Sequence, residues 1–164
     1  MSDRIDVVVI GAGPAGLAVS HELVRAGVVH IVLEKGRVAQ TWRERWDSFC
    51  LVTPNWSAQF PGHRYDGQDP DGFMSRDEMV AFLERYATGF RAPVREDIEV
   101  TSLEPGQEGR FRLETSAGEM TAETVVLCTG AYQRPHRPAG AATLPANLLQ
   151  NIAVVETLVG KAAE

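Results

Sequence analysis

The sequence has 164 residues, of which 44% are hydrophobic and 23% are charged, so it is long enough for one domain with its own core and unlike a disordered chain. Its net charge of −6 argues against a general nucleic-acid-binding surface. The apolar N-terminal run is broken by glycines, and nowhere do apolar residues continue for the ~20 positions of a membrane span, so we expect no membrane segment and a cytoplasmic location.

The first 35 residues are expected to form a strand–helix–strand unit. Residues 7–10 are apolar and β-branched, as in a strand buried on both faces of a parallel sheet. Over residues 14–26 apolar side chains recur at helical spacing, and Gly27 ends that pattern. Residues 30–33 predict a second strand, which ends at Glu34.

The glycines between the first strand and the helix have the spacing of a phosphate-binding turn. Gly11 permits a tight turn, Gly13 lets phosphates approach the backbone, and Gly16 lets the helix lie close to the strand. Pro14 and Ala15 belong to the same helix start. A diphosphate would bind there because the first N–H groups of a helix have no partner within the helix.

Glu34 follows Gly11 by 23 residues, where an acid accepts hydrogen bonds from a ribose. A glycine-rich turn alone is a weak signal, and a structural turn without ligand is the alternative. The strand before the turn, the helix after it and the acid that closes the second strand together favour a dinucleotide.

The middle of the chain alternates between irregular and helical patterns. Residues 41–47 predict a short helix, and residues 48–72 are irregular and rich in turns. Ser75 and Glu78 have the form of a capping box ahead of a helix over residues 76–90. That helix is expected to bury one apolar stripe, formed by Met79, Phe82, Leu83 and Tyr86.

Three strands are expected next, over residues 98–103, 110–115 and 124–128, so that residues 97–128 form a meander. Prolines after residue 130 indicate an extended connector, and a terminal helix is expected within residues 147–164. The predicted fold class is α/β, with a Rossmann-like βαβ unit in a parallel sheet plus a three-stranded β-meander.

Three separated motifs resemble one family of flavoproteins. The first matches an extended FAD-binding pattern at Gly11, Gly13, Gly16, Leu23, Gly27 and Glu34. The other two are residues 36–57 and 124–138. Together they resemble the flavin-containing monooxygenase superfamily, and most closely a bacterial branch of FAD/NADPH oxidoreductase-like proteins. The resemblance implies that residues 1–164 are a single, incomplete FAD-binding domain, with residues 129–164 as connector and divergent tail.

The resemblance also implies where FAD would lie. The diphosphate would bind at the turn formed by Gly11, Gly13, Pro14, Ala15 and Gly16. The ribose would lie near Glu34 and Lys35, and the adenine would contact the backbone of Val100.

The remaining implied residues lie further along the chain. Gln40, Thr41 and Trp42 would pass beside the diphosphate and the flavin. Thr53 and Asn55 would lie near the isoalloxazine. Thr129 and Gly130 match the connector toward the second half of such enzymes.

In that superfamily FAD accepts hydride from NADPH and then reacts with oxygen. The resemblance therefore implies the FAD-binding portion of a flavin-dependent, NAD(P)H-using oxidoreductase or monooxygenase. The alternative is a non-catalytic nucleotide-binding or interaction module, because no second glycine-rich unit for NADPH follows Gly16. An NAD-dependent dehydrogenase is disfavoured by the meander and the Thr-Gly connector.

The sequence indicates neither catalytic residues nor a substrate. Cys50 and Cys128 lack metal-ligand spacing and are interpreted as free thiols in a reducing compartment. Exposed strand edges predict either association into a homo-oligomer, such as a dimer, or poor solubility.

Overall fold

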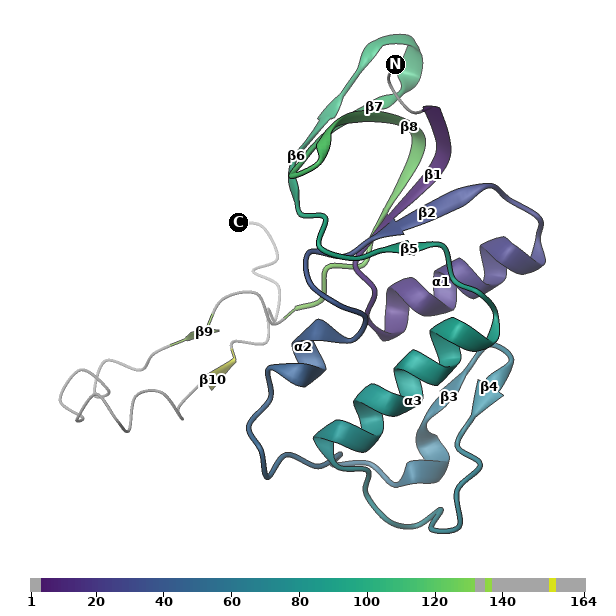
Figure 1. Ribbon diagram of the computed structural model, residues 1–164, viewed down its shortest axis with the longest axis vertical. Coiled ribbons are helices and arrows are strands. Elements are labelled where there is room, and N and C mark those ends of the chain that lie inside the picture. Colours follow the sequence, from purple (N-terminus) through teal and green to yellow (C-terminus); the bar gives the residue numbers. More distant parts are fainter. Residues whose placement is uncertain (1–3, 132–134, 137–153, 156–164) are drawn as a thin grey trace, which may run out of the picture. The chain divides into compact units, whose positions relative to one another are not determined.

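The computed structural model describes residues 4–131, 135–136 and 154–155. The chain divides into two units, residues 1–128 and residues 129–164 (Figure 1). In the part of the chain that is described, no helix is both long and apolar enough to cross a membrane.

One six-stranded sheet organises the first unit, with the strand order β5-β2-β1-β8-β7-β6. Strands β5, β2, β1 and β8 run parallel, whereas β8, β7 and β6 form the antiparallel meander. The strands are β1 (Arg4–Ile10), β2 (His30–Leu33), β5 (Val94–Arg95), β6 (Val100–Pro105), β7 (Phe111–Thr115) and β8 (Gly118–Leu127). The predicted α/β class, with a parallel sheet and a meander, is confirmed.

Strand β8 joins the two halves of this sheet. Its first residues pair with β7, from Gly118 to Ala122, and its later residues pair with β1, from Thr121 to Leu127. The prediction of a strand over residues 124–128 was therefore wrong at its start. Met120 and Ala122 are buried in alternation, which extends the strand back to Gly118.

Each face of the parallel strands is covered by a different layer. Helices α1 (Pro14–Arg25) and α3 (Arg76–Gly89) cover one face, where Val9 and Val32 pack with Leu17 and Phe82. On the other face Val8 and Leu33 belong to a cluster with residues of the meander, among them Leu113. Because successive residues of a strand point to opposite faces, the continuous apolar run of β1 supplies both cores.

The helix predicted over residues 76–90 is confirmed as α3, which ends at Gly89. Its predicted capping box is present: the Ser75 N–H donates to Glu78 Oε2 over 2.8 Å, and the Glu78 N–H donates to Ser75 Oγ over 3.4 Å. The hydrogen bonds from Ser75 lower the pKa of Glu78. The four predicted core residues of this helix are all buried: Met79, Phe82, Leu83 and Tyr86.

The segment between β2 and α3 is less regular. Its elements are α2 (Gln40–Arg43), the 3₁₀ helix η1 (Asn55–Ser57), β3 (Gln59–Phe60) and β4 (His63–Arg64). The helix expected over residues 41–47 is shorter and begins one residue earlier, as α2 ends at Arg43. Beyond its end, Arg76 Nη1 donates to the Arg45 carbonyl over 2.9 Å. A further 3₁₀ helix, η2 (Gln107–Gly109), connects β6 to β7.

The second unit contains an antiparallel pair of short strands, β9 (Pro135–His136) and β10 (Val154–Val155). The expected terminal helix over residues 147–164 is therefore wrong at residues 154 and 155. Its remaining positions lie outside the described residues.

Candidate functional site

The glycine turn lies at the carboxyl end of β1, where parallel sheets bind ligands. Gly11 has φ 107°, and its N–H donates to the Leu33 carbonyl over 2.8 Å. A Cβ at position 16 would lie 1.8 Å from the Gly11 carbonyl oxygen. Gly16 is therefore required by the packing of α1 directly on the turn.

Gly13 differs from Gly16 because it faces open space. A Cβ built on Gly13 meets nothing within 4 Å. Gly13 is the N-cap of α1 and provides no side-chain cap, and Pro14 follows at the first helical position. The helix start thus offers backbone N–H groups and positive dipole to a ligand that approaches at Gly13, which suits a phosphate group.

Glu34 is buried and fixes the shape of this turn. Its Oε2 accepts from the Ala12 N–H over 2.8 Å, and its Oε1 accepts from the Gly36 N–H over 3.1 Å. The carboxylate therefore joins the glycine turn to the loop between β2 and α2. Each carboxylate oxygen has a second lone pair, so acceptance from a sugar hydroxyl is compatible with both bonds.

The loop between β2 and α2 also contacts the turn through its backbone. The Ala39 N–H donates to the Ala12 carbonyl over 3.2 Å, and Ala39 adopts the left-handed region with φ 63°. The Val38 N–H donates to Glu96 Oε1 over 2.7 Å. Our sequence reasoning missed Glu96; its one signal was an acid directly after a short apolar-containing segment, which was not recognised as strand β5.

The predicted residues of the first 35 positions are brought together. Gly11 and Gly13 lie in the turn, and Pro14, Ala15 and Gly16 are the first residues of α1. Glu34 bonds to the turn at Ala12, and Lys35 is exposed beside Glu34 in the sequence. That these residues contact a cofactor stays a prediction.

Three predicted site residues, Gln40, Thr41 and Trp42, lie on α2 and have different surroundings. Gln40 Oε1 accepts from the Arg37 N–H over 3.1 Å, and Thr41 is exposed. Trp42 is partly buried against the core that contains Leu17 and Phe82. The centroid of its ring lies 5.8 Å from that of Phe49. Trp42 therefore has a packing role whether or not it contacts a ligand.

The residues predicted to lie near the flavin and the adenine are Thr53, Asn55 and Val100, which lie outside the glycine turn. Asn55 is 4% exposed; its Oδ1 accepts from the Met74 N–H over 2.6 Å and its Nδ2 donates to the Asp69 carbonyl over 2.9 Å. Thr53 is exposed nearby in the sequence. Val100 pairs with Thr115 and packs against the core that contains Val8 and Leu113.

The carboxyl end of β8 also reaches the turn. The Cys128 N–H donates to the Ile10 carbonyl over 2.8 Å, and its Cβ lies 3.4 Å from the position of a Cβ on Gly16. Burial raises the pKa of the Cys128 thiol. Both cysteines are free, as predicted, and no group of metal-binding side chains occurs among the residues described. Thr129 and Gly130 belong to the second unit.

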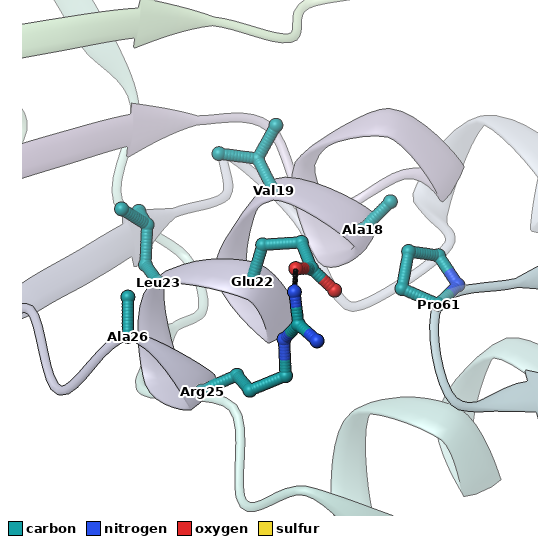
Figure 2. Close-up of a pocket in the computed structure, with 7 residues that line it drawn as sticks. All are labelled: Ala18, Val19, Glu22, Leu23, Arg25, Ala26 and Pro61. Carbon is teal, nitrogen blue, oxygen red and sulfur yellow. Dashed lines mark ion pairs between the residues drawn. The ribbon is translucent and has the colours of Figure 1, made fainter.

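A shallow hollow of about 850 Å³ is lined by residues of α1 and by Pro61, which Figure 2 draws as sticks. Its lining is mainly apolar, with an ion pair between Glu22 and Arg25 at 2.6 Å. The residues that line it come from the middle and end of α1, where backbone N–H groups are bonded within the helix. This hollow therefore lacks the phosphate-binding chemistry of the glycine turn.

Comparison with known proteins identifies the family. Residues 8–147 match the family described as pyridine nucleotide-disulphide oxidoreductase. The chain belongs to this family. The predicted relationship to FAD- and NAD(P)-dependent oxidoreductases is thereby confirmed.

Curated relatives include an uncharacterized CzcO-like oxidoreductase from Geobacillus kaustophilus, which is 38% identical over 92% of this chain and 43% of its own length. A Baeyer-Villiger monooxygenase from Streptomyces coelicolor is 33% identical over 83% of this chain and 27% of its own length. The chain thus spans less than half the length of these curated relatives.

Solved structures agree on the fold. A flavin-containing monooxygenase from Stenotrophomonas maltophilia has a TM-score of 0.73 and 29% identity, covering 83% of this chain and 41% of that protein. The bacillithiol disulfide reductase of Staphylococcus aureus has a TM-score of 0.78 at 17% identity, covering 87% of this chain and 44% of that protein, and shows the fold alone.

Proposed function

We propose that this chain binds FAD at the glycine turn and is the FAD-binding portion of a flavin-dependent, NAD(P)H-using oxidoreductase of the monooxygenase type. The observation that carries the proposal is the uncapped start of α1 at Gly13, where a Cβ would meet no atom within 4 Å. The similarity to flavin-containing and Baeyer-Villiger monooxygenases supports FAD as the dinucleotide.

The residues of the site fit the adenosine-diphosphate part of this cofactor. The N–H groups at the start of α1 would hold the diphosphate, and Glu34 would accept from the ribose. Gly16 keeps α1 against the turn, so that these donors are fixed before the ligand arrives. When bound, FAD would supply the transfer of hydride and the reaction with oxygen.

The test compares two glycines that both face open space. Gly13→Ala places a methyl group where the diphosphate would approach, and Gly89→Ala makes the same change at the end of α3. FAD affinity is measured by titration with flavin fluorescence, and folding by the thermal midpoint. We expect the first variant to bind at least about tenfold more weakly, since a displaced phosphate loses charge-assisted hydrogen bonds.

The control variant should bind like the original chain, and both variants should stay folded. A purified chain that neither carries flavin absorbance nor takes up FAD would contradict the proposal. Equal binding by the Gly13→Ala variant would move the diphosphate away from the turn.

The alternative is a nucleotide-binding module without catalysis. Oxidation of NADPH in the presence of FAD separates the two, because the module predicts FAD binding without turnover.

A homo-oligomer is proposed from the edge of β8. Residues 118–122 of β8 pair with β7, whereas residues 124–127 pair with β1 alone among the described strands. Leu127 in this stretch is 64% exposed. A second copy would pair there, and sedimentation should show a dimer that Leu127→Lys weakens.

Because both cysteines are free thiols, we also propose a reducing, cytoplasmic location.

A further inference from the structure

The loop between β5 and β6 holds the loop between β2 and α2 from two sides. The Val38 N–H donates to Glu96 Oε1 over 2.7 Å. The Asp97 N–H donates to the Gly36 carbonyl over 2.9 Å, with Asp97 in the left-handed region at φ 58°. Glu96 itself is exposed, but Val38 is 8% exposed, so the N–H of Val38 depends on this carboxylate.

The carbonyl of Val38 is held by Arg43 of α2, which is paired in turn with Glu84 of α3. The Val38 carbonyl accepts from Arg43 Nε over 3.2 Å, and the guanidinium of Arg43 pairs with Glu84. Both polar backbone groups of Val38 are therefore bonded to side chains that come from outside its own loop. This arrangement fixes the position of the next residue, Ala39.

Ala39 carries that position to the glycine turn. It is 1% exposed, and its N–H donates to the Ala12 carbonyl over 3.2 Å. Ala12 lies between Gly11 and Gly13, so its peptide groups are part of the turn itself. A continuous series of hydrogen bonds and covalent links thus runs from Glu96 through Val38 and Ala39 to the turn.

We propose that Glu96 is a positioning residue for the dinucleotide: its carboxylate holds the β2–α2 loop against the glycine turn and so sets the affinity of the site. This inference rests on the proposed binding of FAD. Glu96 acts through Val38 and Ala39 and is not expected to touch the ligand.

The test uses three variants of Glu96 and one control. Glu96→Ala removes the acceptor, Glu96→Asp keeps the charge but shortens its reach, and Glu96→Gln keeps an acceptor oxygen without charge. Glu99→Ala removes a nearby exposed carboxylate, since the hydrogen bonds of Glu99 to Ser116 involve its backbone groups. FAD affinity is measured by titration, and backbone order by hydrogen exchange of residues 8–16 and 34–42.

We expect Glu96→Ala and Glu96→Asp to weaken FAD binding about tenfold, which is the size of one lost hydrogen bond. Both should also speed exchange in residues 8–16, although the side-chain hydrogen bond of Glu96 goes to Val38 and not to that segment. Glu96→Gln should stay within about twofold of the original chain, and Glu99→Ala should be unchanged. This rescue by glutamine separates an acceptor from a general charge effect.

Equal FAD affinity in all variants would overturn the inference, as would equal loss in Glu96→Gln or Glu99→Ala. If the original chain fails to bind FAD, the proposed function fails, and exchange decides the positioning role separately. Faster exchange of residues 8–16 in Glu96→Ala and Glu96→Asp alone would then support it, and unchanged exchange would refute it. Should Glu96→Ala not fold, Glu96→Asp provides the same comparison.

Discussion

The glycine turn and the segment from Glu44 to Ser75 are held in place by different means. At the turn, backbone packs on backbone: α1 lies so close to Gly11 that a Cβ on Gly16 would overlap the Gly11 carbonyl oxygen. In the segment, side chains hold an irregular backbone, as Asn55 does by bonding to Met74 and Asp69. Close packing at Gly16 and the carboxylate of Glu34 thus hold the turn, whereas polar side chains bridge the irregular backbone of the segment.

The same comparison extends to exposed surface. Four large apolar side chains of the segment are more than half exposed: Trp46, Val52, Trp56 and Phe73. By contrast, Ala12 in the turn is fully buried. The part of the site proposed to bind the diphosphate is therefore packed within this chain, whereas the segment proposed to lie near the flavin presents apolar surface to solvent.

The largest effect is expected at the turn, from Gly16→Ala. The new methyl group would overlap the Gly11 carbonyl oxygen, so α1 must move, and we expect a loss of about 3 kcal/mol in the free energy of unfolding. Urea denaturation measures this loss. Gly13→Ala is the matched control, with a smaller loss of about 1 kcal/mol because alanine is a poorer N-cap than glycine, and equal losses in the two variants would contradict this difference.

A smaller loss is expected from Asn55→Ala in the segment. The buried Met74 N–H and the Asp69 carbonyl would lose their partner, which costs about 2 kcal/mol. Urea denaturation gives the loss, and limited proteolysis should locate the opened region near residues 46–73. Thr53→Ala, at an exposed position, should be neutral; an Asn55→Ala variant as stable as the original would show that the segment is held by its aromatic packing instead.

The free energy of unfolding should depend on pH through His63 in the hairpin of β3 and β4. Burial lowers the pKa of His63, Asp66 opposes the shift and Arg85 adds to it, and the ring stacks on Tyr86 at 5.3 Å. Since the unfolded chain then binds the proton more readily, stability should be complete above about pH 6.5 and fall as pH decreases toward the lower pKa of the folded state.

His63→Phe keeps the stacked ring and removes the titration, so its stability should vary less between about pH 5 and about pH 7.5. Urea midpoints at the two pH values measure the difference. Parallel profiles for the variant and the original chain would show that the hairpin does not sense the protonation of His63.

The smallest effect is expected in the labelling rates of two thiols, one in the segment and one beside the glycine turn. Cys50 lies exposed in the segment, whereas Cys128 is partly buried beside the turn and burial raises the pKa of its thiol. Labelling with a thiol reagent should therefore be biphasic, with Cys128 at least about tenfold slower. In Cys50→Ser only the slow phase should remain, and a fast phase in that variant would place Cys128 in an open environment.

Local signals in the sequence predicted the parts of the molecule that depend on near neighbours. The βαβ unit, the glycine spacing and the capping box of Ser75 and Glu78 were all recognised, because each forms between residues close along the chain. Strand β5 was missed because it has two residues and exists through its pairing with Val32 and Leu33.

The residues alone predict that α1 meets β1 at a glycine-rich turn, because the glycines at positions 11, 13 and 16 have the spacing that this contact requires. Tertiary structure alone decided that Glu34 and Glu96 hold neighbouring loops and that Asn55 bridges an irregular segment. Their partners lie 22, 58 and 19 residues away, and hydrogen bonds between such distant positions exist only once the sheet and helices have brought them together.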